Sequence, residues 1–186
     1  MKKIQILAAI LFTSLLTVSC SDDDDAIAIV PVNEEELITT INVTLTPVGG
    51  GTVVEYSSQD LDGDGPNLPT VTVSGNLTAG TTYNGTIELL NETEDPAEVI
   101  TEEVEEESVE HQFFYTVGGN LDISTTYTSF DTDGNPLGTT FDLEALTASA
   151  GTLTFTLRHE PTKPNTGASD AGGETDIEVT FDVTVE

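Results

Sequence analysis

Apolar and polar residues alternate along most of the chain after residue 36, which is the pattern of half-buried β-strands. The last two strands are the clearest, because Leu153, Phe155 and Leu157 alternate with threonines, and every second residue from Ile177 to Val185 is apolar. The same pattern predicts further strands at Leu37–Thr46, Thr52–Ser58, Pro69–Ser74, Thr81–Leu90, His111–Val117, Leu121–Phe130 and Leu137–Leu143. About nine short strands predict an all-β fold, a single antiparallel β-sandwich of immunoglobulin-like or jelly-roll-like type.

One segment, DPAEVITEEVEEES, departs from this alternation. Asp95 precedes Pro96, and Glu98 follows three residues after Asp95, which is the spacing of a helical capping box. Its apolar residues share one helical face, and they are Val99, Ile100 and Val104. The sequence therefore predicts a short helix over Pro96–Glu107, and the alternative is an acidic loop at a sheet edge.

Residues 1–20 read MKKIQILAAILFTSLLTVSC and have the organisation of an export signal. Two lysines precede an apolar run that is too short to span a membrane, and small residues then lead to Cys20. The segment resembles a bacterial lipoprotein signal, which implies that residues 1–19 are removed and that Cys20 carries a covalent lipid anchor. The alternative is an ordinary secretory signal with an incidental cysteine.

An acidic run follows Cys20 directly and consists of Ser21, Asp22, Asp23, Asp24 and Asp25. It resembles the signal that sends Bacteroidota lipoproteins to the outer face of the outer membrane, which implies a lipid-anchored protein facing outside. The run also has the character of a solvated, self-repelling tether, and anchoring toward the periplasm is the alternative location. The predicted organisation is a signal peptide over residues 1–19, a lipidated tether over 20–36 and a β-sandwich domain over 37–186.

The composition is strongly acidic, with 34 Asp and Glu against 4 Lys and Arg in 186 residues. Removal of residues 1–19 leaves Arg158 and Lys163 as the basic residues, so that 34 acids against two bases give a formal charge of −32. Nucleic-acid binding is excluded, because no basic patch exists to displace phosphate counterions. The single cysteine excludes an intrachain disulfide, so the core must hold the fold unaided. Divalent cations and basic partner surfaces remain open as ligands.

Two loops carry aspartates at the alternate spacing of calcium-binding loops. The first holds Asp60, Asp62 and Asp64, and the second holds Asp131 and Asp133. Neither completes the EF-hand pattern, and both lie between predicted strands, where Asp and Gly also form ordinary hairpin turns. Bound calcium and plain turns are therefore both open.

Two histidines, His111 and His159, are candidate ligands for a transition metal, because imidazole binds zinc and copper. Each lies next to a glutamate in the sequence, Glu110 and Glu160 respectively. The alternative is a histidine at the rim of the core that is hydrogen-bonded to a carboxylate or to loop backbone.

A Pro- and Gly-rich loop over residues 160–174 joins the last two strands and is longer than a hairpin needs. Its candidate partner or ligand contacts are Arg158, Glu160, Lys163 and Glu174, and the alternative is a surface excursion. The nucleophile-elbow and phosphate-loop motifs of enzymes are missing from the sequence, which predicts a protein that is not an enzyme.

The lipoprotein signal with its aspartate run, NEEELITTINVTLTP, EHQFFY and LRHEP followed by GGETDIEVTF together resemble a family of small acidic surface lipoproteins of Bacteroidota. Its members often carry the label "type 1 periplasmic binding fold superfamily" and tend to be encoded near TonB-dependent receptors. The resemblance implies a ligand-binding or accessory module of an outer-membrane receptor. The alternative is a structural or adhesive surface module with calcium-stiffened loops. The label requires two α/β lobes, whereas the alternating strands favour a single β-domain, and we follow the strands.

Overall fold

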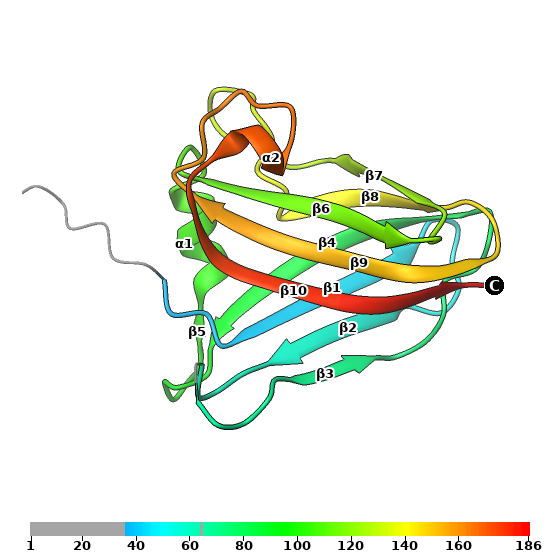
Figure 1. Ribbon diagram of the computed structural model, residues 1–186, viewed down its shortest axis with the longest axis horizontal. Helices are drawn as coiled ribbons and strands as arrows, with labels where there is room; N and C mark the ends of the chain where they lie inside the picture. The colour runs from blue at the N-terminus through cyan, green and yellow to red at the C-terminus, as the bar shows by residue number, and fades with distance from the viewer. Residues whose placement is uncertain (1–35, 64) are drawn as a thin grey trace, which may run out of the picture. The chain divides into compact units, whose positions relative to one another are not determined.

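The strands of the chain form two antiparallel sheets in a computed structural model that describes residues 36–63 and 65–186 (Figure 1). The first sheet has seven strands in the order β3-β2-β1-β4-β8-β7, with β5 paired to β4, and the second has the order β10-β9-β6. The strands of the first sheet are β1 (Thr40–Pro47), β2 (Val54–Gln59), β3 (Thr70–Val73), β4 (Thr81–Asn91), β5 (Glu98–Val99), β7 (Ile123–Tyr127) and β8 (Thr140–Ala145). The strands of the second sheet are β6 (His111–Gly119), β9 (Ser149–His159) and β10 (Glu174–Val185), and the helices are α1 (Ile100–Glu106) and α2 (Ala168–Ala171). The prediction of an all-β sandwich is confirmed.

The alternating apolar residues of both sheets meet in one core. Ile41, Val43 and Leu45 of β1 are fully buried, and so are Phe155 of β9 and Phe181 of β10. The ring of Tyr56 in β2 lies 5.3 Å from that of Phe181, which joins the two sheets. Each large apolar side chain buried in this way contributes about 1.5–3 kcal/mol, so the core holds the sandwich without a disulfide.

The segment predicted as a helix over Pro96–Glu107 forms a short strand and then a shorter helix. Glu98–Val99 pair with the end of β4, so the helix begins at Ile100. The predicted capping box is wrong, because Val99 precedes the helix and makes no side-chain cap hydrogen bond. Pairing with β4 has outweighed the local cap signal, while Ile100 and Val104 of the predicted apolar face are buried.

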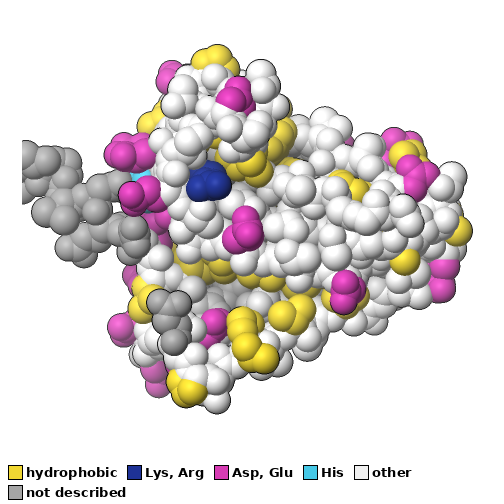
Figure 2. Space-filling model, viewed as in Figure 1, with side chains coloured by type: hydrophobic (Ala, Val, Ile, Leu, Met, Phe, Trp, Pro, Cys, Tyr) yellow, Lys and Arg dark blue, Asp and Glu magenta, His cyan; other side chains and the backbone are white. Residues whose placement is uncertain are grey.

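The polar surface is acidic, as the composition requires. Figure 2 shows Asp and Glu side chains distributed over one face of the molecule around a single basic area. In the described residues, no helix is long and apolar enough to cross a membrane. The predicted lipidation of Cys20 and the acidic run Ser21–Asp25 lie outside the described residues and stay predictions.

Candidate metal centre

Four side chains converge at the end of the sandwich where the chain enters β1: Glu36, His111, His159 and Asp176. Each offers one donor atom, and these atoms all lie within 4.8 Å of one another. The side chains are buried, with exposed fractions of 6%, 0%, 4% and 1% respectively. Figure 2 shows only a small area of histidine surface at this end, with acidic side chains around it. A buried group of imidazoles and carboxylates has the composition of a metal site.

The pairing of β6 with β9 brings the two histidines together. His111 is the first residue of β6 and lies directly opposite His159, the last residue of β9. Residues directly opposite in an antiparallel pair project from the same face, so both imidazoles enter the same space. Their ring centroids are 4.5 Å apart.

Asp176 reaches this space because of an irregularity in β10. The register between β10 and β9 shifts between Thr175 and Ile177, which leaves Asp176 as an extra residue in β10. A β-bulge of this kind redirects a side chain that regular alternation would place on the other face. Asp176 is accordingly 1% exposed, although its neighbours Glu174 and Thr175 are exposed.

Glu36 enters the site from the segment that precedes β1. Leu37 is 58% exposed, whereas Ile38 packs against the core. Side chains alternate along an extended chain, so Glu36 shares the inward side with Ile38. The prediction placed Glu36 at the end of the tether, and the structure makes it part of the domain.

The separations of the donor atoms suit a tetrahedral metal ion. His111 Nε2 lies 3.0 Å from Glu36 Oε1 and 3.9 Å from Asp176 Oδ2. His159 Nδ1 lies 3.6 Å from Glu36 Oε2 and 3.7 Å from Asp176 Oδ1. Ligand atoms about 2.0–2.2 Å from a tetrahedral zinc ion are about 3.3–3.6 Å from one another. The two histidines face different oxygens of each carboxylate, so one oxygen of Glu36 and one of Asp176 would turn toward an ion between the four side chains.

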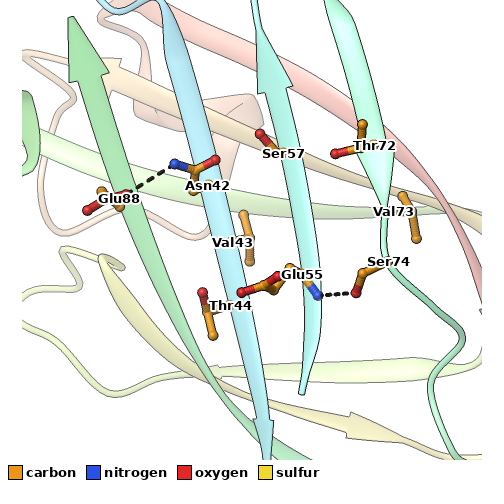
Figure 3. A pocket seen from close by; sticks show the side chains of 9 residues that line it. All are labelled: Asn42, Val43, Thr44, Glu55, Ser57, Thr72, Val73, Ser74 and Glu88. Carbon is orange, nitrogen blue, oxygen red and sulfur yellow. Dashed lines mark hydrogen bonds between the residues drawn. The ribbon is translucent and has the colours of Figure 1, made fainter. Parts of the chain in front are cut away.

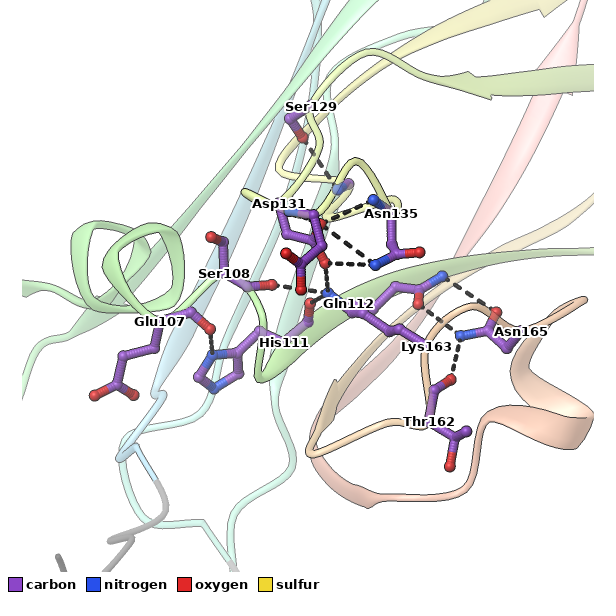
Figure 4. Close-up of polar contacts among 12 residues, drawn as sticks. Glu107, Ser108, His111, Gln112, Ser129, Asp131, Asn135, Thr162, Lys163 and Asn165 are labelled. Carbon is purple, nitrogen blue, oxygen red and sulfur yellow. Dashed lines mark hydrogen bonds and ion pairs between the residues drawn. The ribbon is translucent and has the colours of Figure 1, made fainter.

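The ring of His111 is oriented as a metal ligand requires. Its Nδ1 lies 3.2 Å from the carbonyl oxygen of Glu107, which can only accept, so Nδ1 carries the proton (Figure 4). Nε2 then faces the cluster, and a carbonyl partner of this kind fixes the orientation of metal-bound histidines. Burial lowers the pKa of His111, against the opposing effect of the Glu36 carboxylate, and this favours the neutral imidazole.

The donor set distinguishes among metals. Calcium takes oxygen ligands, whereas two nitrogens and two carboxylate oxygens suit zinc or copper. With neutral imidazoles and ionised carboxylates the cluster carries two negative charges, which a divalent cation balances. Buried carboxylates without such compensation are costly. All four positions are filled by protein, as in structural zinc sites.

A second group shares His159 with this cluster. Glu110, His159 and Glu160 also place donor atoms within 4.8 Å of one another, but both glutamates are exposed. One nitrogen and two exposed carboxylates make a weaker site than the buried group. The glutamates adjacent to the histidines in sequence are thus the lesser partners, and the better ones are Glu36 and Asp176.

In the second predicted calcium loop, both carboxylate oxygens of Asp131 accept hydrogen bonds from protein groups. Its Oδ1 accepts the backbone N–H groups of Asp133 at 3.0 Å and Asn135 at 2.8 Å. Its Oδ2 receives the Lys163 ammonium at 3.1 Å. Burial opposes ionisation of Asp131, but the N–H groups of Asn135 and the ammonium outweigh it and hold the pKa of Asp131 below its ordinary value. These contacts describe a turn that Lys163 closes, whereas the alternative to calcium named a plain turn and did not include the lysine.

The first predicted calcium loop is only partly described. Asp62 Oδ2 accepts a hydrogen bond from the side chain of Asn67 at 2.7 Å, and Asp60 Oδ1 accepts the Asp62 N–H at 3.3 Å. Asp64, the third predicted ligand, lies outside the described residues. Calcium at this loop stays a prediction.

The long loop before β10 is fastened by Lys163, which was predicted to contact a partner. The ammonium donates to the carbonyl oxygens of Ser108 and His111 as well as to Asp131, and the side chain is 6% exposed (Figure 4). Lys163 therefore has a structural role in fastening the loop, and its contact with a partner stays a prediction. Arg158 lies between Gln112 and Thr175 in the sheet register, while Glu160 and Glu174 are exposed.

Two hollows of the surface lie apart from the metal cluster. One, of 290 Å³, is lined by residues of the long loop and by neighbouring strands, and Asn165 Nδ2 there donates to Gln112 Oε1 at 2.8 Å. The other, of 440 Å³, lies over β1, β2 and β3, and Asn42 at its floor donates to Glu88 at 3.1 Å (Figure 3). Both are lined by polar and apolar groups in similar measure, and neither is lined by a residue of the metal cluster.

Comparisons of the chain with protein-family models, with curated proteins and with solved structures find no match. Function is therefore inferred from the residues of the site. The sequence pointed to His111 and His159, and the structure brings them together. It gave no signal for Asp176, whose orientation depends on a bulge, or for Glu36, which follows two other glutamates.

Proposed function

We propose that this protein is an exported, lipid-anchored β-sandwich that binds a divalent transition metal, preferably zinc, through Glu36, His111, His159 and Asp176. One observation carries the proposal: two imidazoles and two carboxylates are buried together, and one donor atom of each lies within 4.8 Å of the others. The fixed orientation of His111 supports it, because its Nδ1 contacts the Glu107 carbonyl oxygen and its Nε2 faces the two carboxylates.

At the cell surface such a protein would serve as a ligand-binding or accessory module of an outer-membrane receptor of the TonB-dependent type. The lipoprotein-like signal ending at Cys20, the acidic run Ser21–Asp25 and the family resemblance support this role. The acidic surface supports it further, because it raises the local concentration of cations around the domain.

The second candidate function is a structural or adhesive surface module, in which the metal only stabilises the fold. The observation that favours it is the burial of all four ligands, since a closed site leaves no position for an exchangeable ligand. The two functions share the metal site and differ in partner. Co-purification of the lipidated protein from native membranes separates them, because only the accessory role predicts that a receptor is recovered.

Metal binding itself is tested on full-length protein without a polyhistidine tag, stripped with a chelator and titrated with zinc by calorimetry. We expect one zinc ion per chain in the wild type and loss of that binding in His111→Gln and Asp176→Asn. Asp182→Asn is the matched control, because Asp182 is an exposed carboxylate of the same strand. Absence of bound zinc in the wild type, or unchanged binding in both ligand variants, would contradict the proposal.

A further inference from the structure

The four ligands come from two separate parts of the sandwich. His111, His159 and Asp176 belong to β6, β9 and β10, which together make up the second sheet. Glu36 belongs to the segment that leads into β1 of the first sheet. An ion at this site would therefore join the first sheet, through its entering chain, to all three strands of the second.

The entering chain is weakly held before Thr39. Thr39 donates its backbone N–H to Leu90 at 2.9 Å, and its hydroxyl accepts the N–H of Glu92 at 2.8 Å, so the chain is fixed from that residue onward. We call residues 36–38 the lead segment. In the described part of the chain, the lead segment makes no backbone hydrogen bond, and it is attached by the side chains of Ile38 and Glu36.

We propose that the metal acts as a clasp that fastens the lead segment to the second sheet. This inference rests on the proposed metal-binding function. In a chain with one cysteine, a metal bridge of this kind does the work that a disulfide between sheets does in other sandwiches. Metal occupancy then decides whether the chain leaves the domain at Glu36 or at Ile38, which packs against the core in either case.

The geometry places both parts of the clasp around one space. The carboxylates of Glu36 and Asp176 each lie within 3.9 Å of both imidazoles. A divalent ion between them would attach the lead segment and the second sheet to the same centre. Release of Glu36 and Leu37, which precede the contact of Ile38 with the core, adds about 7 Å of extended chain between the domain and whatever precedes it.

The lead segment also lies next to the predicted tether in the sequence. It directly follows residues 20–35, which the sequence predicts to be the lipidated tether. A clasp at this point makes the length of chain between the domain and its predicted lipid anchor depend on the metal concentration outside the cell. The chemistry selects a borderline transition metal such as zinc, because calcium does not favour nitrogen ligands.

The clasp is tested with a spin label at Leu37→Cys, in a full mature chain that carries Cys20→Ser so that the label is unique. Leu37 is 58% exposed and is not a ligand, so the label does not disturb the site. The same label at Val48→Cys, in the exposed turn after β1, is the control for general stiffening. Zinc binding to each protein is measured in parallel by calorimetry.

Zinc is expected to slow the motion of the label at position 37 by a factor on the order of two or more, with no change at position 48. Glu36→Gln is expected to abolish this slowing even where the remaining three ligands still bind zinc. Zinc binding without slowing at position 37, or equal slowing in Glu36→Gln, would overturn the clasp and leave the metal site intact. Absence of zinc binding would overturn both the clasp and the proposed function.

Discussion

His111 Nε2 lies 3.0 Å from the carboxylate of Glu36, across the boundary between the second sheet and the chain that enters the first. The contact joins residues that are remote in sequence, and both side chains are buried. Because Nδ1 of the same imidazole faces the carbonyl oxygen of Glu107, the orientation of His111 is set from outside the cluster. The fold thus orients one donor atom in advance of any ion.

Loss of Asp176 should remove most of the stabilisation that zinc provides. At a zinc concentration of about 100 times Kd, binding to the folded state adds about 2.7 kcal/mol. For a domain of this size that corresponds to a rise in Tm of about 5–10 °C. We expect this rise in the wild type and in Asp182→Asn, but not in Asp176→Asn, when melting is followed by circular dichroism. Equal rises in all three proteins would show that zinc acts elsewhere.

Lys163 should contribute strongly to stability, because its ammonium is the buried link between the long loop and two other segments. Removal of one partner from a buried ion pair costs about 3–5 kcal/mol, and Lys163→Met also leaves the carbonyl oxygens of Ser108 and His111 without this donor. Denaturant unfolding should show a loss of this size. The double variant with Asp131→Asn should lose less than the sum of the two single variants, since both disrupt one contact. Strict additivity would show that the pair is not coupled.

Alternation of apolar and polar residues determined much of this fold because it depends only on neighbouring positions. Leu153, Phe155 and Leu157 are fully buried as the pattern requires. The start of α1 was misplaced, because a long-range pairing of Glu98–Val99 with β4 competes with the local cap signal. Short-range patterns predict which face of a strand is buried, but they do not reveal its partners.

The candidate site was only half predictable for the same reason. His111 and His159 stand out as the chain's two histidines, yet their proximity depends on the register of β6 against β9. Asp176 faces the site through a bulge that nothing in GGETDIEVTF marks. Glu36 resembles the glutamates before it and is distinguished only by where the extended chain meets the second sheet.

The packing of Phe141 against β4 predicts a sensitive glycine. A Cβ atom added at Gly85 would lie 2.4–2.7 Å from three atoms of the Phe141 ring, which is itself fully buried. Gly85→Ala should therefore destabilise the fold by about 1–3 kcal/mol, as overpacking does. Gly75→Ala is the matched control, because a Cβ there meets nothing within 4 Å and its φ is not positive. Similar unfolding midpoints for the two variants in urea would contradict this account of the core.

Calcium at the first aspartate loop is separable from zinc at the cluster. If Asp60 and Asp62 bind calcium together with Asp64, added calcium should raise Tm in the wild type and in Asp176→Asn, but not in Asp62→Ala. The alternative is a plain turn, which the hydrogen bond from Asn67 to Asp62 is enough to close. In that case calcium should leave all three melting curves unchanged. A calcium effect that survives Asp62→Ala would exclude this loop as the site.

The predicted lipid anchor and the predicted surface-export signal can be tested independently of the metal. Cys20→Ala should abolish incorporation of labelled fatty acid and move the protein from the membrane fraction to the soluble fraction, because the lipid is the predicted attachment. Substitution of Asp22–Asp25 by alanine should leave lipidation intact but protect the protein from protease added to intact cells, since the acidic run is the predicted signal for surface display. Zinc binding should persist in both variants, because none of these residues is a ligand. Digestion of the alanine variant at the wild-type rate would show that the run is a tether without an addressing role, and would leave its self-repulsion as the reason for its charge.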